Sequence, residues 1–233
     1  MLIGAVNKFS LLDFPGETSC IVFTVGCNFR CSYCHNPEFV LPEMIKNTSK
    51  NLIPENIFFN FLEKRKNLLT GVSICGGEPT LQKDLYDFCK KVKDMGFKVK
   101  LDTNGRDFDI IKNLLDDNLL DYIAMDVKNP LEDYNEITKI NDNIENYSKS
   151  IEIIMKSKVD YEFRTTVIKG FHTFESLKKI FKLITGAKKY YIQNFRNGDI
   201  LDRNFEGISF SKAELLNLKE MALQFVKYVE IRD

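Results

Sequence analysis

Hydrophobic positions along this chain switch repeatedly between two patterns. Apolar or alternating runs, which are typical of strands, cover residues 19–25, 71–75, 97–103, 120–128, 161–168 and 188–195. Apolar residues at helical spacing recur within 54–68, 85–95, 110–115, 144–155, 174–184 and 212–226. Because a helical stripe follows each run, the pattern predicts an α/β fold with a parallel sheet, either open or curled into a partial barrel.

Turn and cap residues mark the ends of several expected elements. Gly96 stops one helical stripe, and Ser211 with Glu214 predicts a capping box at the start of the last helix. Residues 129–148 form a long polar stretch, which predicts a mobile loop over one end of the sheet and a candidate lid. No low-complexity linker separates the elements, so we expect a single domain.

Composition narrows the function classes. The chain has 233 residues, of which 44% are hydrophobic, so it can bury a sizeable core. Its 33 basic and 33 acidic residues balance, so bulk charge gives no indication of nucleic-acid or membrane-surface binding. No apolar run approaches the roughly 18 residues of a membrane helix, and the first residues lack a signal-peptide pattern. We therefore expect a cytoplasmic protein, in which clustered cysteines bind metals or carry redox chemistry.

The unusual polar and glycine-rich segments share one position in the predicted fold. Each comes at the carboxyl end of an expected strand, which is where parallel α/β sheets bind their ligands. These segments are Cys27–Cys34, Gly76–Pro79, Asp102–Gly105, Asp126–Lys128, Arg164–Thr166 and Gln193. Their common placement on one rim predicts a shared site.

Three of the six cysteines, Cys27, Cys31 and Cys34, lie within eight positions. Their spacing also fits one face of a helix, but the polar residues between them would make a poor core helix. An odd number of thiols leaves one without a disulfide partner, and a zinc site would need His35 as an adjacent fourth ligand, which is awkward for tetrahedral closure. The remaining interpretation is a [4Fe–4S] cluster with three thiolate ligands. Such clusters normally take four cysteines, so one iron would stay open to a catalytic ligand.

The spacing Cys27-x3-Cys31-x2-Cys34, with Tyr33 before the last cysteine, resembles the signature of the radical S-adenosylmethionine (radical SAM) superfamily. The segments "VFTVGCNFRCSYCHNPE", "SLLDFPG", "CGGEPTLQ", "DTNG" and "AMDVK" are similar to the activating enzymes of anaerobic ribonucleotide reductase. Those enzymes are a branch of the glycyl-radical-enzyme activases, and the resemblance covers most of the chain.

The resemblance implies a fold and a division of the chain. The fold would be a partial (β/α)6 barrel of the radical SAM type, with parallel strands. One radical SAM domain would span residues 1–233, with its core at about 17–195 and a C-terminal helical extension at about 209–233.

The resemblance also implies two cofactors, one [4Fe–4S] cluster and S-adenosylmethionine. The open iron would bind the methionyl amine and carboxylate, and one electron would split the sulfonium to give a 5′-deoxyadenosyl radical, which abstracts a hydrogen atom. The residues implied as cluster ligands, and hence as catalytic, are Cys27, Cys31 and Cys34. The residues implied for S-adenosylmethionine are Tyr33, Gly76, Gly77, Glu78, Thr103, Asn104, Asp126, Lys128 and Arg164.

Several of these positions have a simpler interpretation beside the implied one. Thr103-Asn104 is also ordinary turn chemistry. Asp126 and Lys128 alternate along one strand and point the same way, which suits either a cofactor contact or a salt bridge between them. Arg164 sits among apolar neighbours and would pair either the cofactor carboxylate or an acidic residue of the chain.

Other polar positions carry weaker expectations. His35 fits the wording of the branch without an assigned role, and His172, on a polar turn, is expected at the surface. Gln193 faces the rim and is a candidate contact for a substrate peptide. The isolated cysteines are expected in the core, which argues against a second cluster; they are Cys20, Cys75 and Cys89.

The resemblance suggests the partners as well. The radical would take hydrogen from a glycine Cα of a glycyl radical enzyme, namely anaerobic ribonucleoside-triphosphate reductase, with flavodoxin or ferredoxin as electron donor. Two alternatives stay open. One is a radical SAM enzyme acting on a small molecule, such as 7-carboxy-7-deazaguanine synthase. The other is a non-enzymatic iron–sulfur or zinc binding module, which would not need Glu78, Asp126 and Lys128 on the same rim.

Overall fold

The computed structural model describes residues 1–141 and 143–232. In these residues eight strands form one sheet, ordered as in the chain. They are β1 (Ile3–Ser10), β2 (Ser19–Thr24), β3 (Gly71–Gly76), β4 (Lys98–Thr103), β5 (Tyr122–Asp126), β6 (Asp160–Val167), β7 (Tyr190–Asn194) and β8 (Val229–Arg232). β1 is antiparallel to β2, and every later neighbouring pair is parallel. The predicted α/β fold with a parallel sheet is confirmed.

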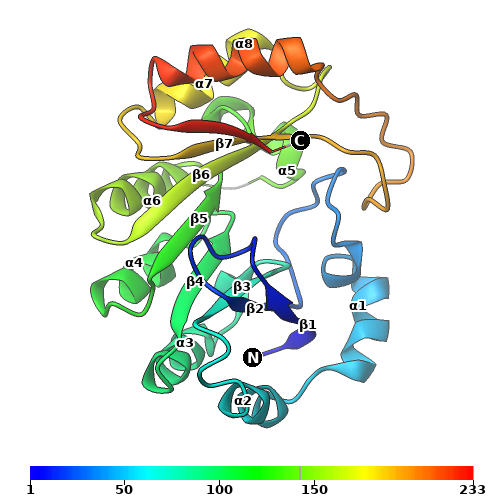
Figure 1. The fold of residues 1–233 in the computed structure, drawn as a ribbon. Helices are drawn as coiled ribbons and strands as arrows, with labels where there is room; N and C mark the ends of the chain where they lie inside the picture. Colours follow the sequence, from blue (N-terminus) through cyan, green and yellow to red (C-terminus); the bar gives the residue numbers. More distant parts are fainter. Residues whose placement is uncertain (142, 233) are drawn as a thin grey trace.

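Helices connect the strands and cover the outside of the sheet. They are α1 (Pro42–Thr48), α2 (Glu55–Glu63), α3 (Leu85–Asp94), α4 (Phe108–Asp116), α5 (Tyr134–Thr138), α6 (Glu145–Lys156), α7 (Phe174–Leu183) and α8 (Lys212–Leu223). Figure 1 shows the sheet curving around an interior, with α2, α3, α4, α6 and α7 on its outer side. β1 and β8 are the two edges of this partial barrel. None of the helices in the described part of the chain is long and apolar enough to cross a membrane.

The two faces of the sheet differ in chemistry, and β4 illustrates why. Val99 and Leu101 are fully buried in the main hydrophobic cluster. Lys100 and Asp102 alternate with them, point to the opposite face and form an ion pair with each other. The apolar residues therefore bind the sheet to its helices, while the inner face of the barrel carries charged side chains.

An aromatic residue closes the end of the barrel at which the strands begin. Phe14, on the turn between β1 and β2, is only 2% exposed and forms a small buried cluster with Tyr122 and Ala124. The first residue of β3, Gly71, has no room for a side chain there, because a Cβ would lie 2.8 Å from the Phe14 ring. The interior is consequently open toward the carboxyl ends of the strands.

Residues 129–148 differ from the loop that their polarity predicts. They contain a 3₁₀ turn (Leu131–Asp133), all of α5 and the start of α6, while residue 142 lies outside the described residues. Tyr134 and Tyr147 are each 1% exposed, and their ring centroids are 4.4 Å apart. The tyrosine pair packs α5 against α6 in the core, so this stretch is partly helical and the prediction of a loop is wrong, while its role as a lid stays a prediction.

The chain ends also differ from expectation. The segment at about 209–233 contains α8 as predicted, with the Ser211–Glu214 capping box, but β8 follows it and joins the sheet beside β7. β1 was likewise not predicted. Both are edge strands with many half-exposed positions, so their apolar pattern is weak.

Candidate active site

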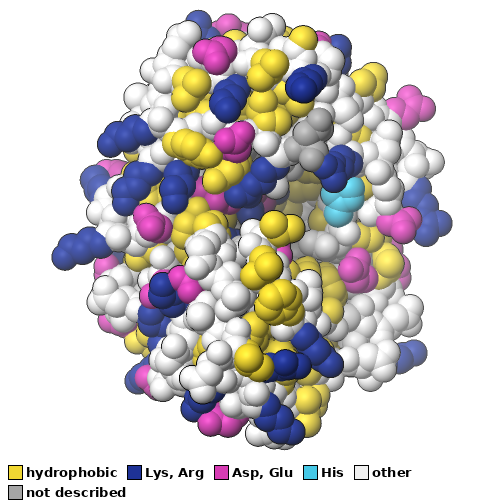
Figure 2. Space-filling model, viewed as in Figure 1, with side chains coloured by type: hydrophobic (Ala, Val, Ile, Leu, Met, Phe, Trp, Pro, Cys, Tyr) yellow, Lys and Arg dark blue, Asp and Glu magenta, His cyan; other side chains and the backbone are white. Residues whose placement is uncertain are grey.

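A cavity of about 300 Å³ opens at the carboxyl ends of the strands. Figure 2 shows a hollow near the middle of the face that Figure 1 presents, between the N-terminal half below and the C-terminal half above. The residues lining the cavity are Cys27, Phe29, Cys31, Tyr33, Cys34, His35, Asn36, Val40, Cys75, Gly76, Gly77, Glu78, Asp102, Thr103, Asn104, Asp126, Lys128, Arg164, Thr166 and Gln193. Every site residue expected from the sequence is among them.

The cysteine loop, residues 26–36, leaves β2 and forms one wall of the cavity. All three of its cysteines are free thiols. The Phe29 amide donates to the Sγ of Cys27 at 3.3 Å, and a tight turn joins the Cys34 amide to the Cys31 carbonyl at 3.0 Å. Burial raises the pKa of Cys27 to about 12 and that of Cys31 to about 11. Without a cation to take the thiolate charge, these sulfurs therefore stay protonated at neutral pH.

The three thiols suit a cluster better than a single ion. In the described chain no three His, Cys, Asp or Glu side chains are gathered closely enough to hold one metal ion. A four-iron cluster needs no such convergence, because each thiolate binds its own iron. The chemistry of the donor set, three cysteines on one short loop, fits that group.

An orphaned polar atom supports the fit of a ligand beside this loop. The Tyr33 hydroxyl is buried and has no hydrogen-bond partner in the protein, although its residue lines the cavity. The Nδ2 of Asn28 is equally buried and unpartnered. Because buried polar groups are nearly always satisfied, the Tyr33 hydroxyl is suited to a polar ligand in the cavity, whereas Asn28 does not line it.

Gly76 and Gly77 bring β3 against the cysteine loop. A Cβ on Gly77 would collide with the Gly26 carbonyl, and one on Gly76, at φ +111°, would collide with the Thr24 backbone. The Gly77 and Glu78 amides donate to the Thr24 and Gly26 carbonyls, both at 2.8 Å. The double glycine is therefore needed for contact between two backbone segments of the protein itself.

Asn36 completes this connection, since its Nδ2 donates to the Gly76 carbonyl at 3.3 Å. That bond gives the Asn of the "CHNP" segment a structural position. His35 is exposed at the cavity mouth.

Glu78 follows Gly77 just after β3, lines the cavity and is 2% exposed. Its Oε1 accepts from the Thr80 amide at 3.1 Å and from the hydroxyls of Thr80 and Thr103, both at 2.7 Å. Its Oε2 accepts from the Asn104 amide at 2.8 Å. Burial raises the pKa of Glu78 despite these bonds. The carboxylate thus joins the ends of β3 and β4, and Oε2 keeps room for one more donor.

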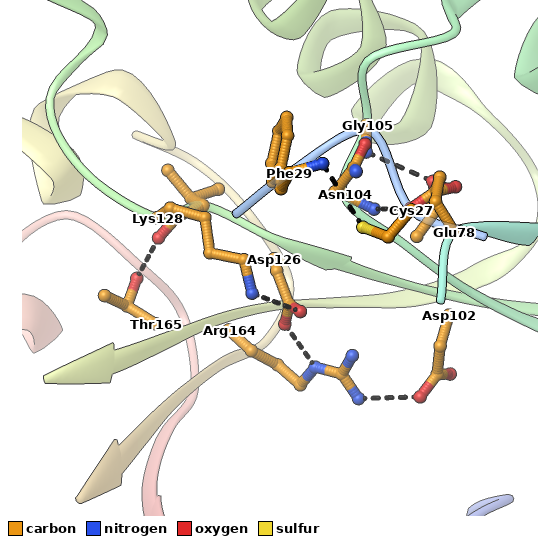
Figure 3. Close-up of polar contacts among 12 residues, drawn as sticks. Cys27, Phe29, Glu78, Asp102, Asn104, Gly105, Asp126, Lys128, Arg164 and Thr165 are labelled. Carbon is orange, nitrogen blue, oxygen red and sulfur yellow. Dashed lines mark hydrogen bonds and ion pairs between the residues drawn. The ribbon is translucent and has the colours of Figure 1, made fainter. Parts of the chain in front are cut away.

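Four charged residues form the opposite wall (Figure 3). Arg164 on β6 bridges two strands: its Nη1 lies 3.0 Å from Asp102 Oδ2, and its Nε lies 2.9 Å from Asp126 Oδ1. Lys128 Nζ lies 2.9 Å from Asp126 Oδ2. Burial alone would raise the pKa of Asp126, but the charges of Arg164 and Lys128 outweigh it and hold that pKa well below its usual range. Both internal pairings weighed from the sequence are therefore present.

Sequence reasoning missed a strap over the cysteine loop. The connection between β7 and α8 pairs with it: the Leu201 amide donates to the Cys34 carbonyl at 2.9 Å, and the Asp202 amide to the Ser32 carbonyl at 3.0 Å. The Phe205 ring lies 6.3 Å from that of Tyr33. Phe205, an aromatic residue within the polar connection between β7 and α8, was the sequence feature that could have indicated this contact.

The structure also places the remaining histidine, the isolated cysteines and Gln193. His172 is 2% exposed, so the prediction of a surface histidine is wrong. Cys20 and Cys89 are fully buried as predicted, whereas Cys75 is half-buried and lines the cavity rather than the core. Gln193 lines the cavity from β7.

A family model for the radical SAM superfamily matches residues 21–184, and this chain belongs to that superfamily. Its cofactors are accordingly a [4Fe–4S] cluster and S-adenosylmethionine. The chain is 33% identical over 239 residues to a candidate glycyl-radical enzyme activating enzyme of Methanocaldococcus jannaschii, covering 99% of this chain and 95% of the relative. It is 29% identical over 192 residues to the pyruvate formate-lyase-activating enzyme of Clostridium pasteurianum, covering 80% and 79%.

Among solved structures, SuiB of Streptococcus suis aligns with a TM-score of 0.69 at 13% identity, over 91% of this chain. The aligned part is 48% of SuiB, so this chain spans about half of that protein. This likeness shows the fold alone.

Proposed function

We propose that this protein is an activating enzyme for a glycyl radical enzyme, and that its partner is anaerobic ribonucleoside-triphosphate reductase. The observation that carries the proposal is the common cavity, onto which the three clustered cysteines and the polar residues of β3 to β6 converge. The relatives with activase names, one of which matches nearly the whole chain, support the same class. The choice of reductase rests on the similarity of five sequence segments, including the cysteine segment, to the activating enzymes of that reductase.

In this proposal the cysteine loop holds the cluster. Cys27, Cys31 and Cys34 supply its three thiolates, and the main-chain bonds to β3 and to the β7–α8 strap fix their positions. The Phe29 amide, which donates to the Cys27 sulfur, stabilises that sulfur as a thiolate. The strap also places the Phe205 ring beside Tyr33 of the loop.

The rest of the cavity would hold S-adenosylmethionine. Tyr33, with its unpartnered hydroxyl, would meet the nucleoside part of the ligand. On the β3–β4 side, Gly76, Gly77, Glu78, Thr103 and Asn104 would face the methionyl amine. On the other side, Asp126, Lys128 and Arg164 would meet the ribose and the carboxylate, since Lys128 and Arg164 bring positive charge to that wall.

When bound, the cluster and S-adenosylmethionine would supply a 5′-deoxyadenosyl radical for abstraction of hydrogen from a glycine Cα. One electron from flavodoxin or ferredoxin would be consumed, and methionine and 5′-deoxyadenosine would be released. The protein's own part is to orient the sulfonium and to exclude stray hydrogen donors. A cavity that opens at the rim of an incomplete barrel suits a substrate that is a loop of another protein.

The test is a glycyl radical signal. The protein is reconstituted anaerobically, reduced, and mixed with S-adenosylmethionine and anaerobic ribonucleoside-triphosphate reductase. We expect a glycyl radical in the electron paramagnetic resonance (EPR) spectrum of the reductase, and none with the Cys31→Ala variant. Intact cleavage of S-adenosylmethionine without a radical in this or other glycyl radical enzymes would contradict the activase assignment and favour a small-molecule substrate.

A further inference from the structure

Lys128 lies just beyond β5, where the strand ladder no longer holds its main chain. β5 ends at Asp126, and the last ladder-like bond is that of the Val127 amide to the Arg164 carbonyl, at 2.8 Å. The Lys128 amide instead donates to the hydroxyl of Tyr134 at 3.2 Å, and its carbonyl lies 3.0 Å from Nε2 of His172. Two side chains, one from the nearby α5 and one from the turn after β6, therefore fix the backbone of this one residue.

The hydrogen bonds of His172 determine its tautomer. The Ile168 amide donates to Nδ1 at 3.0 Å, so Nδ1 must carry a lone pair. The proton of the neutral ring is then on Nε2, which donates it to the Lys128 carbonyl. The ring is 2% exposed, so no water replaces either bond. His172 thus links the turn after β6 to the residue that follows β5.

Tyr134 holds the same residue from the other side. Its hydroxyl accepts from the Lys128 amide and donates to the Asp126 carbonyl at 3.3 Å. The ring is 1% exposed and packs edge-on against Phe29 of the cysteine loop, with centroids 6.3 Å apart. Its position therefore depends on the cysteine loop and on α5 together.

These contacts fix the main chain of Lys128, and its side chain extends from that fixed point into the cavity wall. The ammonium reaches along the cavity wall to Asp126 and is well shielded from solvent. A shift of the Lys128 backbone would move this charge relative to the cavity. The side chains that fix the backbone consequently control where the positive charge lies.

We propose that His172 is a positioning residue for S-adenosylmethionine, acting through its Nε2–H bond to the Lys128 carbonyl, with Tyr134 as its counterpart on the Lys128 amide. The proposal rests on the function proposed above, because it needs Lys128 to contact that cofactor. It adds two residues that do not line the cavity and that lie outside the sequence motifs of the site.

A purely structural role for His172 makes a different prediction, because the imidazole also satisfies the Ile168 amide within its own turn. Two amide side chains separate the roles. His172→Gln places an N–H near Nε2 and keeps a donor for Lys128, whereas His172→Asn places an oxygen near Nδ1 and keeps only the acceptor for Ile168.

The experiment measures the dissociation constant of S-adenosylmethionine for the reduced, cluster-loaded protein, from its effect on the cluster's EPR spectrum. We expect His172→Gln to bind within about threefold of the unchanged protein, and His172→Asn about tenfold more weakly, the equivalent of one lost buried hydrogen bond. Weaker binding by Gln than by Asn, or equal binding by both, would overturn the proposal.

A second pair of variants keeps the test decisive if the histidine variants fold poorly. Tyr134→Phe leaves the turn after β6 untouched and should weaken binding several-fold with unchanged iron content. In a Lys128→Met background, which should itself bind weakly, His172→Asn should have no further effect, because its link to the site runs through Lys128. Additive effects in that background would contradict action through Lys128.

If the unchanged protein does not bind S-adenosylmethionine, the proposed function itself fails. If the unchanged protein binds it and all variants bind it equally well, only the inference about His172 and Tyr134 fails.

Discussion

The two walls of the cavity are built on different physical principles. The wall formed by the cysteine loop and the end of β3 is held by main-chain hydrogen bonds and by glycines that admit no added atom. The wall between β4 and β6 is held by charges, with Arg164 bridging Asp102 and Asp126. The first wall should therefore be damaged by the addition of atoms and the second by the removal of charge.

Removal of the bridging charge should have the largest effect. Arg164→Met leaves Asp102 and Asp126 without their shared partner. The effect should be large because the side chain of Arg164 is only 12% exposed. Arg164 makes two charge-assisted hydrogen bonds, each worth about 1.5–3 kcal/mol, so their loss should cost about 3–6 kcal/mol although Lys100 and Lys128 remain beside the two carboxylates. Urea denaturation of the cofactor-free protein measures the change.

The control for this prediction is Lys156→Met, at a fully exposed helical pair with Glu152. Its loss should leave the free energy of unfolding essentially unchanged, because both partners are exposed to solvent. A loss below about 1 kcal/mol at Arg164 would contradict the view that charge holds this wall.

On the other wall, one added methyl group should be enough to destabilise the protein. Gly76→Ala introduces both a left-handed φ, costing about 1–2 kcal/mol, and a collision with the Thr24 backbone, costing roughly 1–3 kcal/mol more. Gly96→Ala is the matched control, because Gly96 also has a positive φ of +90° but nothing within 4 Å of the added Cβ. Denaturation should separate the two by the collision cost, and only the Gly76 variant should lose bound iron. Equal behaviour would show that the close approach is unimportant.

Acid should weaken the charged wall gradually. The pKa of Asp102 is lowered: burial opposes this, but the neighbouring Arg164 and Lys100 charges outweigh burial. A carboxyl whose folded pKa is depressed contributes stability above its unfolded value, here about 3.8, and loses it as the pH falls toward the folded pKa. The free energy of unfolding should thus decline as the pH falls from 5 to 3, and less steeply in Asp102→Asn. If the free energy of unfolding of Asp102→Asn fell with pH as steeply as that of the unchanged protein, Asp102 would be excluded as a source of the acid sensitivity.

The smallest expected effect on stability is at Tyr33. Because the hydroxyl has no partner in the protein, Tyr33→Phe should leave the cofactor-free protein equally stable or up to about 1 kcal/mol more stable. The same variant should bind S-adenosylmethionine more weakly in the cluster-loaded protein. A clear loss of stability without the cofactor would instead indicate an internal partner for the hydroxyl.

The inner fold is predictable from the sequence for a physical reason. The six strands β2 to β7 lie between neighbours and are mostly buried, so their apolar runs are strong. The edge strands β1 and β8 carry many half-exposed residues and give little signal. α5 was missed because only the burial of Tyr134 against Tyr147, a tertiary contact, distinguishes it from a polar loop.

The candidate site is predictable where chemistry depends on spacing along the chain. The three cysteines of the cluster motif lie close together in the sequence, and so do the double glycine and Glu78. Both groups line the expected cavity. His172 could not be placed in the same way. Its burial depends on the Ile168 amide within its turn and on the Lys128 carbonyl 44 positions away, and neither bond leaves a pattern in the sequence.

The cleavage of S-adenosylmethionine tests the central claim most directly, by measuring 5′-deoxyadenosine from anaerobically reconstituted and reduced protein. Cys89, which is buried in the core, provides the matched control for Cys31. The account predicts 5′-deoxyadenosine from the unchanged protein and from Cys89→Ala, and none from Cys31→Ala, which should also lack the cluster. Product formation by Cys31→Ala at the unchanged rate, or none by a protein that holds a full complement of iron, would contradict it.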